Sequence, residues 1–212
     1  MSDLEIIGAP QSNYVRSVRI ACEEKGVAYK LVVVRPHTPD VDAIHPFGKI
    51  PVMRHGDFTL CESKAIATYV DRTFAGPKLF PDDAKLGTKI EQWVSLENTT
   101  IIPATNNYLA YYFFRKLPDG SLDHAAIDAA LPDAKKALEV LNAAASDGFL
   151  AGDMFTYADM NILPVLAYLR ELPETGEIMK SLRHLTRYFE THAERPSFKA
   201  TIPPPFSALP LR

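Results

Sequence analysis

The chain has 212 residues, of which 47% are hydrophobic and 23% are charged, and its formal net charge is -3. A charge so close to zero gives no electrostatic basis for binding nucleic acid, and no apolar run approaches the roughly 18–20 residues of a membrane span. The opening residues MSDLEIIGAP lack the basic region and long apolar core of a secretion signal. We therefore expect a cytoplasmic protein with no nucleic acid or membrane partner, built as one large domain or two small ones.

The cysteines and histidines do not follow the spacing patterns of metal or redox sites. The two cysteines, Cys22 and Cys61, form no CxxC pair, so we interpret them as small buried hydrophobic residues. The six histidines show neither an HExxH motif nor a His/Cys ligand spacing. We therefore expect no metal cofactor.

The first 34 residues predict a strand, a helix and a second strand. The run LEIIG (4–8) is typical of a short buried strand. Apolar residues then recur at helical spacing from Tyr14 to Lys25, and Gly26 is expected to end that helix. The β-branched run YKLVVV (29–34) predicts the next strand. Two strands joined by a helix are expected to lie parallel.

Residues 35–74 predict a loop, a hairpin and a second helix. Three prolines and Gly48 indicate an irregular loop over 35–50, with at most one weak helix. The segment PVMRHGDFTLC (51–61) reads as two short strands around a Gly-Asp turn, and the helix ESKAIATYVDRTF follows it. The hairpin adds an antiparallel pair, so we expect a four-stranded mixed sheet with helices packed on it.

The character of the chain changes after residue 75. The segment AGPKLFPDDAK (75–85) is rich in proline and glycine and indicates a linker, and no convincing strand follows it. Thr156 and Asp159 have the spacing of a helix capping box, and Pro103 is expected to kink or divide the first helices. Helices are predicted at about 84–102, 105–117, 122–145, 157–172 and 178–193.

Four motifs in this sequence resemble those of the cytosolic glutathione transferases. They are GAPQSNYVRSVR (8–19), HPFGKIPV (45–52), LCESKAIATYV (60–70) and FLAGDMFTYADM (149–160). Each motif is weak alone, but the four occur in the family's order and spacing, and the resemblance covers nearly the whole chain. It includes features of the phi-like and the zeta-like bacterial and plant types.

The resemblance implies an α/β thioredoxin-like N-terminal domain (βαβ-ββα, four-stranded mixed sheet) followed by an all-α C-terminal helical bundle. We expect the first domain over 1–76, a linker over 77–85 and the helical domain over 86–212. In this family the first domain binds glutathione, and the second contributes the site of the electrophile.

The family's reaction is the attack of the glutathione thiolate on an electrophile, with glutathione as cosubstrate. A hydroxyl that donates a hydrogen bond to the sulfur favours the charged thiolate. The resemblance implies Ser12 for this catalytic role, with Tyr14 and Asn13 as alternates. The structural alternative is that Ser12 only caps the helix that follows it.

The resemblance also implies which residues bind the middle of glutathione. Pro51 is expected to follow a cis peptide bond, which turns the backbone of Ile50 outward to pair with the cysteinyl residue of the tripeptide. The alternative is an ordinary strand that begins with proline.

The two charged ends of glutathione have their own candidate residues. Glu62 suits the ammonium of the γ-glutamyl end, and Ser63 with the helix N-terminus suits its carboxylate. Lys49 and His37 are the candidates for the glycyl carboxylate. His45 occupies the position where the family usually has an asparagine before Pro-Phe-Gly.

The aromatic segment NNYLAYYFFRKL (106–117) is the candidate wall for the electrophile. Its aromatic side chains cannot all face one core, so we expect some of them to line the second site or a dimer junction. We select Tyr108 and Tyr112, spaced by four residues, together with Tyr14. Burial in the helical core is the alternative, and Asp159 is interpreted as structural.

Glutathione transfer to a small hydrophobic electrophile is the expected function, with peroxide reduction as a possible additional activity, and the family implies a homodimer active in detoxification. One alternative is a zeta-like glutathione-dependent isomerase of a dicarboxylate, which needs cations such as Arg16, Arg19 and Arg115. A second alternative is a non-catalytic glutathione-fold binding protein. A dithiol oxidoreductase is disfavoured, because residues 8–16 contain no cysteine.

Overall fold

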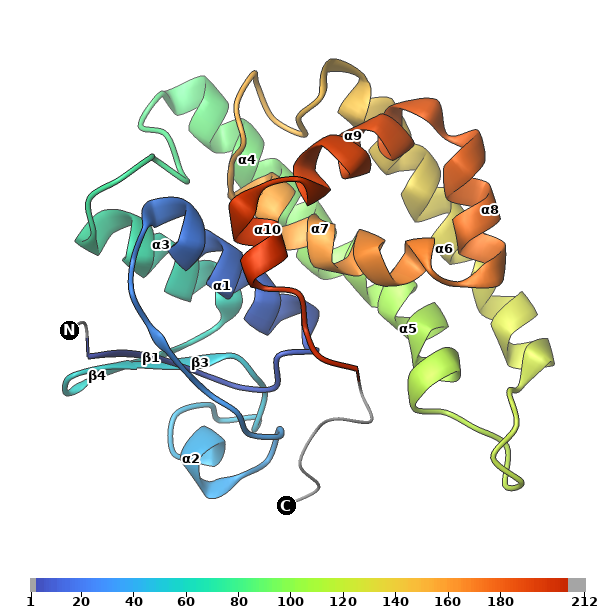
Figure 1. The fold of residues 1–212 in the computed structure, drawn as a ribbon, viewed down its shortest axis with the longest axis horizontal. Coiled ribbons are helices and arrows are strands. Elements are labelled where there is room, and N and C mark those ends of the chain that lie inside the picture. Colours follow the sequence, from blue (N-terminus) through green and yellow to red (C-terminus); the bar gives the residue numbers. More distant parts are fainter. Residues whose placement is uncertain (1–2, 206–212) are drawn as a thin grey trace. The chain divides into compact units, whose positions relative to one another are not determined.

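The computed structural model describes residues 3–205 and divides into two compact units (Figure 1). The first unit comprises the chain up to Asp82 and again from Ala193, and the second runs from Asp83 to His192. The division expected from the sequence assigned all of 86–212 to the helical part, whereas the described residues from Ala193 onwards pack with the first unit. Residues 1–2 and 206–212, which the predicted domains include, lie outside the described residues.

A four-stranded mixed sheet forms the centre of the first unit, as expected. Its spatial order is β2-β1-β3-β4, with β1 parallel to β2 and antiparallel to β3, and with β3 antiparallel to β4. The strands are β1 (Leu4–Ile7), β2 (Lys30–Val32), β3 (Val52–His55) and β4 (Phe58–Cys61).

The strand register brings three chain segments to one end of the sheet. Ile7, the last residue of β1, is aligned with Val52, the first residue of β3. Val52 is in turn aligned with Cys61, the last residue of β4. Residues 8–12, 49–51 and 62–63 therefore all leave or enter the sheet at this same end.

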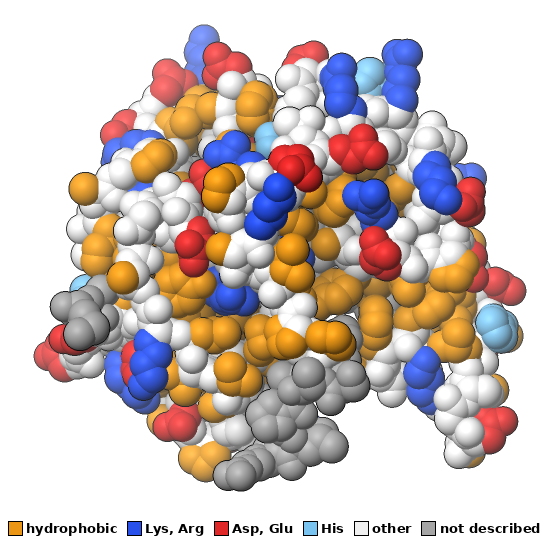
Figure 2. All heavy atoms as spheres, in the orientation of Figure 1, with side chains coloured by type: hydrophobic (Ala, Val, Ile, Leu, Met, Phe, Trp, Pro, Cys, Tyr) orange, Lys and Arg blue, Asp and Glu red, His pale blue; other side chains and the backbone are white. Residues whose placement is uncertain are grey.

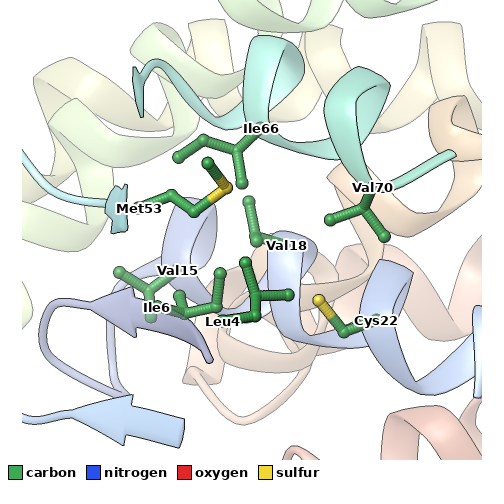
Figure 3. Close-up of a cluster of buried hydrophobic side chains, with 8 residues drawn as sticks. All are labelled: Leu4, Ile6, Val15, Val18, Cys22, Met53, Ile66 and Val70. Carbon is green, nitrogen blue, oxygen red and sulfur yellow. The ribbon is translucent and has the colours of Figure 1, made fainter. Parts of the chain in front are cut away.

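Both faces of the sheet carry apolar side chains, because successive residues of a strand point to opposite faces. Leu4 and Ile6 of β1 belong to the larger cluster, while Ile7 belongs to a smaller one with Val41 and Val52. Figure 3 shows the larger cluster, whose members come from β1, β3, α1 (Asn13–Lys25) and α3 (Ser63–Thr73). They are Leu4, Ile6, Val15, Val18, Cys22, Met53, Ile66 and Val70.

The two cysteines differ in exposure. Cys22 is completely buried in the larger cluster, and burial raises the pKa of its thiol to about 12, so it packs as a small hydrophobic residue. Cys61 is only half-buried at the end of β4. The prediction of burial is therefore confirmed in full only for Cys22.

Charged side chains of α1 hold the short helix α10 (Pro196–Ala200) in the first unit. Glu24 accepts two hydrogen bonds from Arg195, each 2.7 Å long. Arg16 donates to the Phe198 carbonyl at 3.2 Å, and its guanidinium lies 4.0 Å from the centre of the Phe198 ring. Arg19 donates to the carbonyl of Thr201 at 3.3 Å. These contacts explain why the residues after Ala193 associate with α1.

The second unit is helical, as predicted. Within the described residues its only β-type pairing is an isolated bridge between Lys116 and Leu122. The π-helical turn η1 (Glu97–Ile101) separates its first two helices, and Pro103 falls in the first turn of the second, where a missing N–H is tolerated. The helices are α4 (Ala84–Leu96), α5 (Ile102–Phe113), α6 (His124–Ala144), α7 (Tyr157–Arg170), α8 (Pro173–Ser181) and α9 (Arg183–Ala193).

One predicted helix forms as two helices. The sequence pattern predicted one helix over 178–193, but the chain forms α8 and α9, which are separated at Leu182. Leu182 has φ −97° and ψ 81°, outside the helical region, and its N–H bonds the Met179 carbonyl. Apolar periodicity does not register such a short interruption, because both helices keep a buried face.

Asp159 holds together the start of α7, which confirms its structural interpretation. Its Oδ2 accepts the Thr156 backbone N–H at 2.9 Å, which completes the predicted capping box. Its Oδ1 accepts the Leu150 N–H at 2.9 Å and the Tyr188 hydroxyl at 3.0 Å. A fully buried carboxylate is tolerated here because several donors surround it.

Glu97 is a second fully buried carboxyl, but it has fewer partners. Asn161 Nδ2 donates to Glu97 Oε2 at 2.8 Å and to Asn98 Oδ1 at 3.0 Å. Within the described residues, Glu97 Oε1 and Asn161 Oδ1 have no hydrogen-bond partner. Burial raises the pKa of Glu97 well above its ordinary value, and the Asn161 hydrogen bond only partly opposes this.

The surface of the molecule carries charges of both signs. Figure 2 shows basic and acidic side chains interspersed among apolar ones over the face that it draws. Among residues 3–205, no helix has both the length and the apolar character required to span a membrane. Phe47 and Phe114 are the most exposed large hydrophobic side chains of the described residues.

Replacing Glu97 with Gln should raise the free energy of unfolding at neutral pH and leave it nearly unchanged below about pH 4.5, the ordinary carboxyl value. The folded protein binds this proton more tightly than the unfolded chain does, so the wild type loses stability as pH rises through the window above 4.5. Glutamine does not ionise, so the advantage of the variant should grow by up to about 1.4 kcal/mol per pH unit until the folded pKa is reached.

Urea denaturation across a pH series measures this difference. Glu190→Gln, at an exposed position of α9, is the matched control and should differ from the wild type by a small amount that is independent of pH. A difference for Glu97→Gln that does not vary with pH would contradict the assignment.

Candidate functional site

The turn between β1 and α1 packs directly against the loop that precedes β3. The Gly8 N–H bonds the Val32 carbonyl at 2.9 Å, which anchors the start of the turn. A Cβ atom on Gly8 would lie 2.6 Å from Val15 Cγ2 and 3.0 Å from Ile50 Cβ, so only glycine permits this approach. Because Gly8 has no side chain, the turn that ends at Ser12 is able to pack against Ile50.

Ser12 caps α1, and this role does not exclude another. Its Oγ accepts the Val15 backbone N–H at 3.4 Å, and its side chain is half-buried. A hydroxyl that accepts a hydrogen bond through a lone pair still has its own hydrogen to donate. Ser12 is thus able to cap the helix and donate to a ligand at once. The alternates Asn13 and Tyr14 are the first two residues of α1, and both are half-buried.

The loop before β3 has the expected backbone form. The peptide bond between Ile50 and Pro51 is cis. Pro51 is buried, Ile50 is half-buried and Lys49 is exposed. The backbone of Ile50 thus lies beside the turn that carries Ser12.

His45 organises the start of this loop. Its ring is only 4% exposed, and its Nδ1 accepts the Phe47 N–H at 3.0 Å. Its carbonyl accepts the Gly48 N–H at 2.9 Å, and its own N–H bonds the Val41 carbonyl of α2 (Pro39–Asp42) at 2.7 Å. The histidine therefore forms the local side-chain bond of the turn itself, at the position where the resemblance implies an asparagine.

His37 is held close to the same loop. Its N–H bonds the Gly48 carbonyl at 2.9 Å, and its ring Nδ1 lies 3.9 Å from Asp42 Oδ1. A Cβ atom on Gly48 would lie 2.1 Å from His37 Nδ1 and 2.6 Å from Asp42 Oδ1. The structure thus brings the exposed side chain of His37 next to Gly48, the neighbour of Lys49.

Glu62 and Ser63 lie where β4 passes into α3. Glu62 has φ +71°, which is an uncommon conformation for a residue with a side chain, and its carboxylate is 72% exposed. Ser63 is buried in the first turn of α3, where the partial positive charge of the helix N-terminus favours anions. The Nε2 atom of His45 lies 3.4 Å from Glu62 Oε1.

The site therefore combines an exposed carboxylate, two helix N-termini, a capping hydroxyl and a loop with a cis-proline. Within the described residues, no three His, Cys, Asp or Glu side chains come together as metal ligands would. This arrangement suits a small ligand that carries charge at both ends. The exposed carboxylate favours a cationic group, and the helix N-termini favour anionic groups.

The structure brings Tyr108 and Tyr112 together in the second unit. Tyr108 is completely buried, and its hydroxyl donates to Glu174 Oε2 at 2.7 Å. The hydroxyl of Tyr112, a half-buried residue, donates to the same oxygen. Burial opposes ionisation of Glu174, but these two hydrogen bonds contribute to a net lowering of the pKa of its carboxyl. No sequence signal pointed to Glu174, because it lies 62 residues beyond Tyr112.

The three arginines considered as cations for a second substrate all have structural contacts. Arg16 and Arg19 bond carbonyls of α10 and the residue after it. Arg115 is exposed, donates to Asn107 Oδ1 at 2.9 Å and lies over the Tyr111 ring at 5.3 Å. Each of the three guanidinium groups therefore has a structural role that does not require a dicarboxylate ligand.

Two family models and several known proteins match this chain. Residues 6–78 match the family model of the glutathione S-transferase N-terminal domain, and residues 104–196 match that of the C-terminal domain. Glutathione S-transferase 3 of Zea mays is 33% identical, with 98% of this chain and 100% of that protein covered. The probable glutathione S-transferase GSTF1 of Oryza sativa subsp. japonica is 28% identical, with 94% and 95% covered.

Solved structures show the same fold. Glutathione transferase F7 from Populus trichocarpa is 29% identical and has a TM-score of 0.84, with 93% of this chain and 97% of that chain covered. The plant relatives support the phi-like reading of the motifs. Because the two family models together cover more than half of the chain and a relative that is 33% identical covers 98% of it, the chain belongs to the glutathione S-transferase family.

Proposed function

We propose that this protein is a glutathione S-transferase that binds reduced glutathione in its first unit and activates the thiol for attack on a small apolar electrophile. The observation that carries the proposal is the register of Ile7, Val52 and Cys61, because it gathers the candidate groups at one end of the sheet. The curated relatives that are named glutathione S-transferases over nearly the whole chain support it.

Ser12 is the proposed donor to the sulfur. A free thiol has a pKa near 8.5, so only about 3% is ionised at pH 7. A hydrogen bond to an ion contributes roughly 1.5–3 kcal/mol, whereas the N-terminus of α1 adds about 0.3–1 kcal/mol. The hydroxyl is therefore the larger of the two effects. Asn13 and Tyr14 remain the alternates.

The remaining groups would bind the rest of the tripeptide. Ile50, after which the cis bond to Pro51 follows, would pair its backbone with the cysteinyl residue. Glu62 would bind the γ-glutamyl ammonium, and Ser63 with the N-terminus of α3 its carboxylate.

The glycyl carboxylate would meet Lys49 and His37. The exposure of both side chains and the hydrogen bond from His37 to Gly48 support this assignment.

We propose Tyr112 of the second unit for the electrophile wall and, as a separate assignment that the resemblance implies, Tyr14 of the first unit. A fully buried ring offers no surface to a ligand, so we assign Tyr108 to the support of Tyr112 through their shared hydrogen-bond acceptor Glu174.

The isomerase alternative lacks support, because Arg16 and Arg19 already donate hydrogen bonds to carbonyls of α10 and the residue after it. Peroxide reduction, a homodimeric state, a cytoplasmic location and a role in detoxification belong to the same proposal.

Retention on immobilised glutathione, followed by a turnover panel, tests the function. The panel is a chlorodinitrobenzene, cumene hydroperoxide and maleylacetoacetate. We expect retention and conjugation of the aromatic chloride. Isomerisation of maleylacetoacetate alone would favour the zeta-like alternative, and retention without any turnover would favour a binding protein.

Ser12→Ala should raise the pKa of enzyme-bound glutathione by about 1–2 units, which corresponds to the loss of one hydrogen bond to an ion. The ultraviolet absorbance of the thiolate, titrated against pH, measures this value. The effect on turnover should be smaller than the change in thiolate fraction, because a more basic thiolate is also more nucleophilic.

Two further variants separate this role from helix capping. Glycine retains most of the capping effect but has no hydroxyl, whereas threonine retains both. Ser12→Gly should therefore match Ser12→Ala in thiol pKa, and Ser12→Thr should match the wild type. An unchanged titration in the alanine and glycine variants would exclude Ser12 as the donor.

Gly48→Ala should weaken glutathione binding, and Gly56→Ala should not. Both glycines have φ +61°, so each substitution carries a similar strain of roughly 1–2 kcal/mol. A Cβ on Gly48 would displace the His37 ring, whereas nothing lies within 4 Å of a Cβ on Gly56. Calorimetry should show a two- to fivefold loss of glutathione affinity for Gly48→Ala, which corresponds to about the free energy of one exposed ionic contact. Equal affinities for the two variants would remove His37 from the site.

A further inference from the structure

The ring of His45 contacts two segments of the site through its two nitrogen atoms. Nδ1 accepts the Phe47 N–H at 3.0 Å inside the loop that leads to Ile50. Nε2 lies 3.4 Å from Glu62 Oε1, at the start of α3. The side chain is almost fully buried, so its orientation is set by packing.

The hydrogen bond at Nδ1 determines which nitrogen carries hydrogen. A neutral imidazole has one N–H and one acceptor nitrogen, and the acceptor is here Nδ1. The hydrogen of the neutral ring is therefore on Nε2, which is the atom that faces the carboxylate of Glu62. The ring thus presents a donor edge to Glu62.

Glu62 needs such a contact to be oriented. Its carboxylate is 72% exposed, its backbone has φ +71°, and its side chain makes no capping bond to α3. A long exposed side chain samples several rotamers unless a neighbour restricts it. Among the contacts of the described residues, the 3.4 Å distance from His45 Nε2 to Glu62 Oε1 is the one that the structure gives for this carboxylate.

We propose that His45 is a positioning residue for Glu62: it joins the loop that carries Ile50 and Pro51 to the carboxylate that recognises the ammonium of glutathione. The inference rests on the proposed function, since it concerns the same ligand. Asparagine at position 45 would also accept the Phe47 N–H, but both its polar atoms are bonded to one carbon. The imidazole places its donor on the far side of the ring, so histidine alone of the two serves both segments.

The test compares two ligands on each variant. The first is glutathione, and the second is glutaryl-cysteinyl-glycine, which differs only by the absence of the ammonium. Calorimetry gives the ratio of the two dissociation constants for the wild type and for His45→Asn. Because both ligands are measured on one variant, partial unfolding or general distortion of the loop cancels in the ratio.

We expect the wild type to prefer glutathione, and His45→Asn to reduce that preference about two- to fivefold, as expected for a partly exposed ionic contact. In a Glu62→Gln background the same substitution should leave the preference unchanged. His124→Asn, exposed at the start of α6, is the matched control and should behave as the wild type. His45→Gln, whose amide extends further than that of asparagine, should recover part of the preference.

The outcomes separate this inference from the proposed function. If the wild type binds neither ligand, the proposed function itself fails. If the wild type prefers glutathione but His45→Asn weakens both ligands equally, His45 only shapes the loop, and the positioning role is overturned. A preference that His45→Asn still reduces in the Glu62→Gln background would overturn it as well, since the effect would not pass through Glu62.

Discussion

The alignment of Ile7, Val52 and Cys61 across three strands is the constraint on which the site depends. Hydrogen bonds between neighbouring strands fix this register, and a slip by one residue would move every side chain of a strand to the opposite face. The apolar residues on both faces of β1 make such a slip costly. Three segments that are distant in sequence therefore meet at one end of the sheet because its core permits only one pairing.

The same constraint sets the electrostatics of the site. Both α1 and α3 begin at this end of the sheet, one after β1 and the other after β4. Their N-termini carry unsatisfied N–H groups and partial positive charge, which favour anions such as a thiolate or a carboxylate. Ser12 satisfies one N–H of α1 and still has a hydrogen to donate. Ser12 is thus able to cap α1 and to donate a hydrogen bond to a ligand at the same time.

Buried polar groups play different parts in the two units. Asp159 has enough donors around it to stay buried as a helix cap, whereas Glu97 has one donor and an unsatisfied oxygen within the described residues. In the first unit Lys25 and Asp71 form a buried ion pair that also binds the backbone near Gly76. Breaking such a pair is costly, because it leaves an uncompensated charge in the interior.

The side chain of His45 is also almost fully buried, and the two edges of its ring face two different segments of the first unit.

The sequence by itself determined the element types, the capping box at Thr156, the mixed sheet and the family, because these depend on local periodicity, turn residues and motif spacing. It also predicted the cis bond before Pro51. Only the tertiary structure decided that Glu174 accepts from two tyrosines, that Arg16 and Arg19 hold α10, and that His45 faces Glu62. The residues that these contacts join lie from 17 to 182 positions apart along the chain. Local pattern carries no information on such pairs, because their distance is set by strand register and helix packing rather than by spacing along the chain.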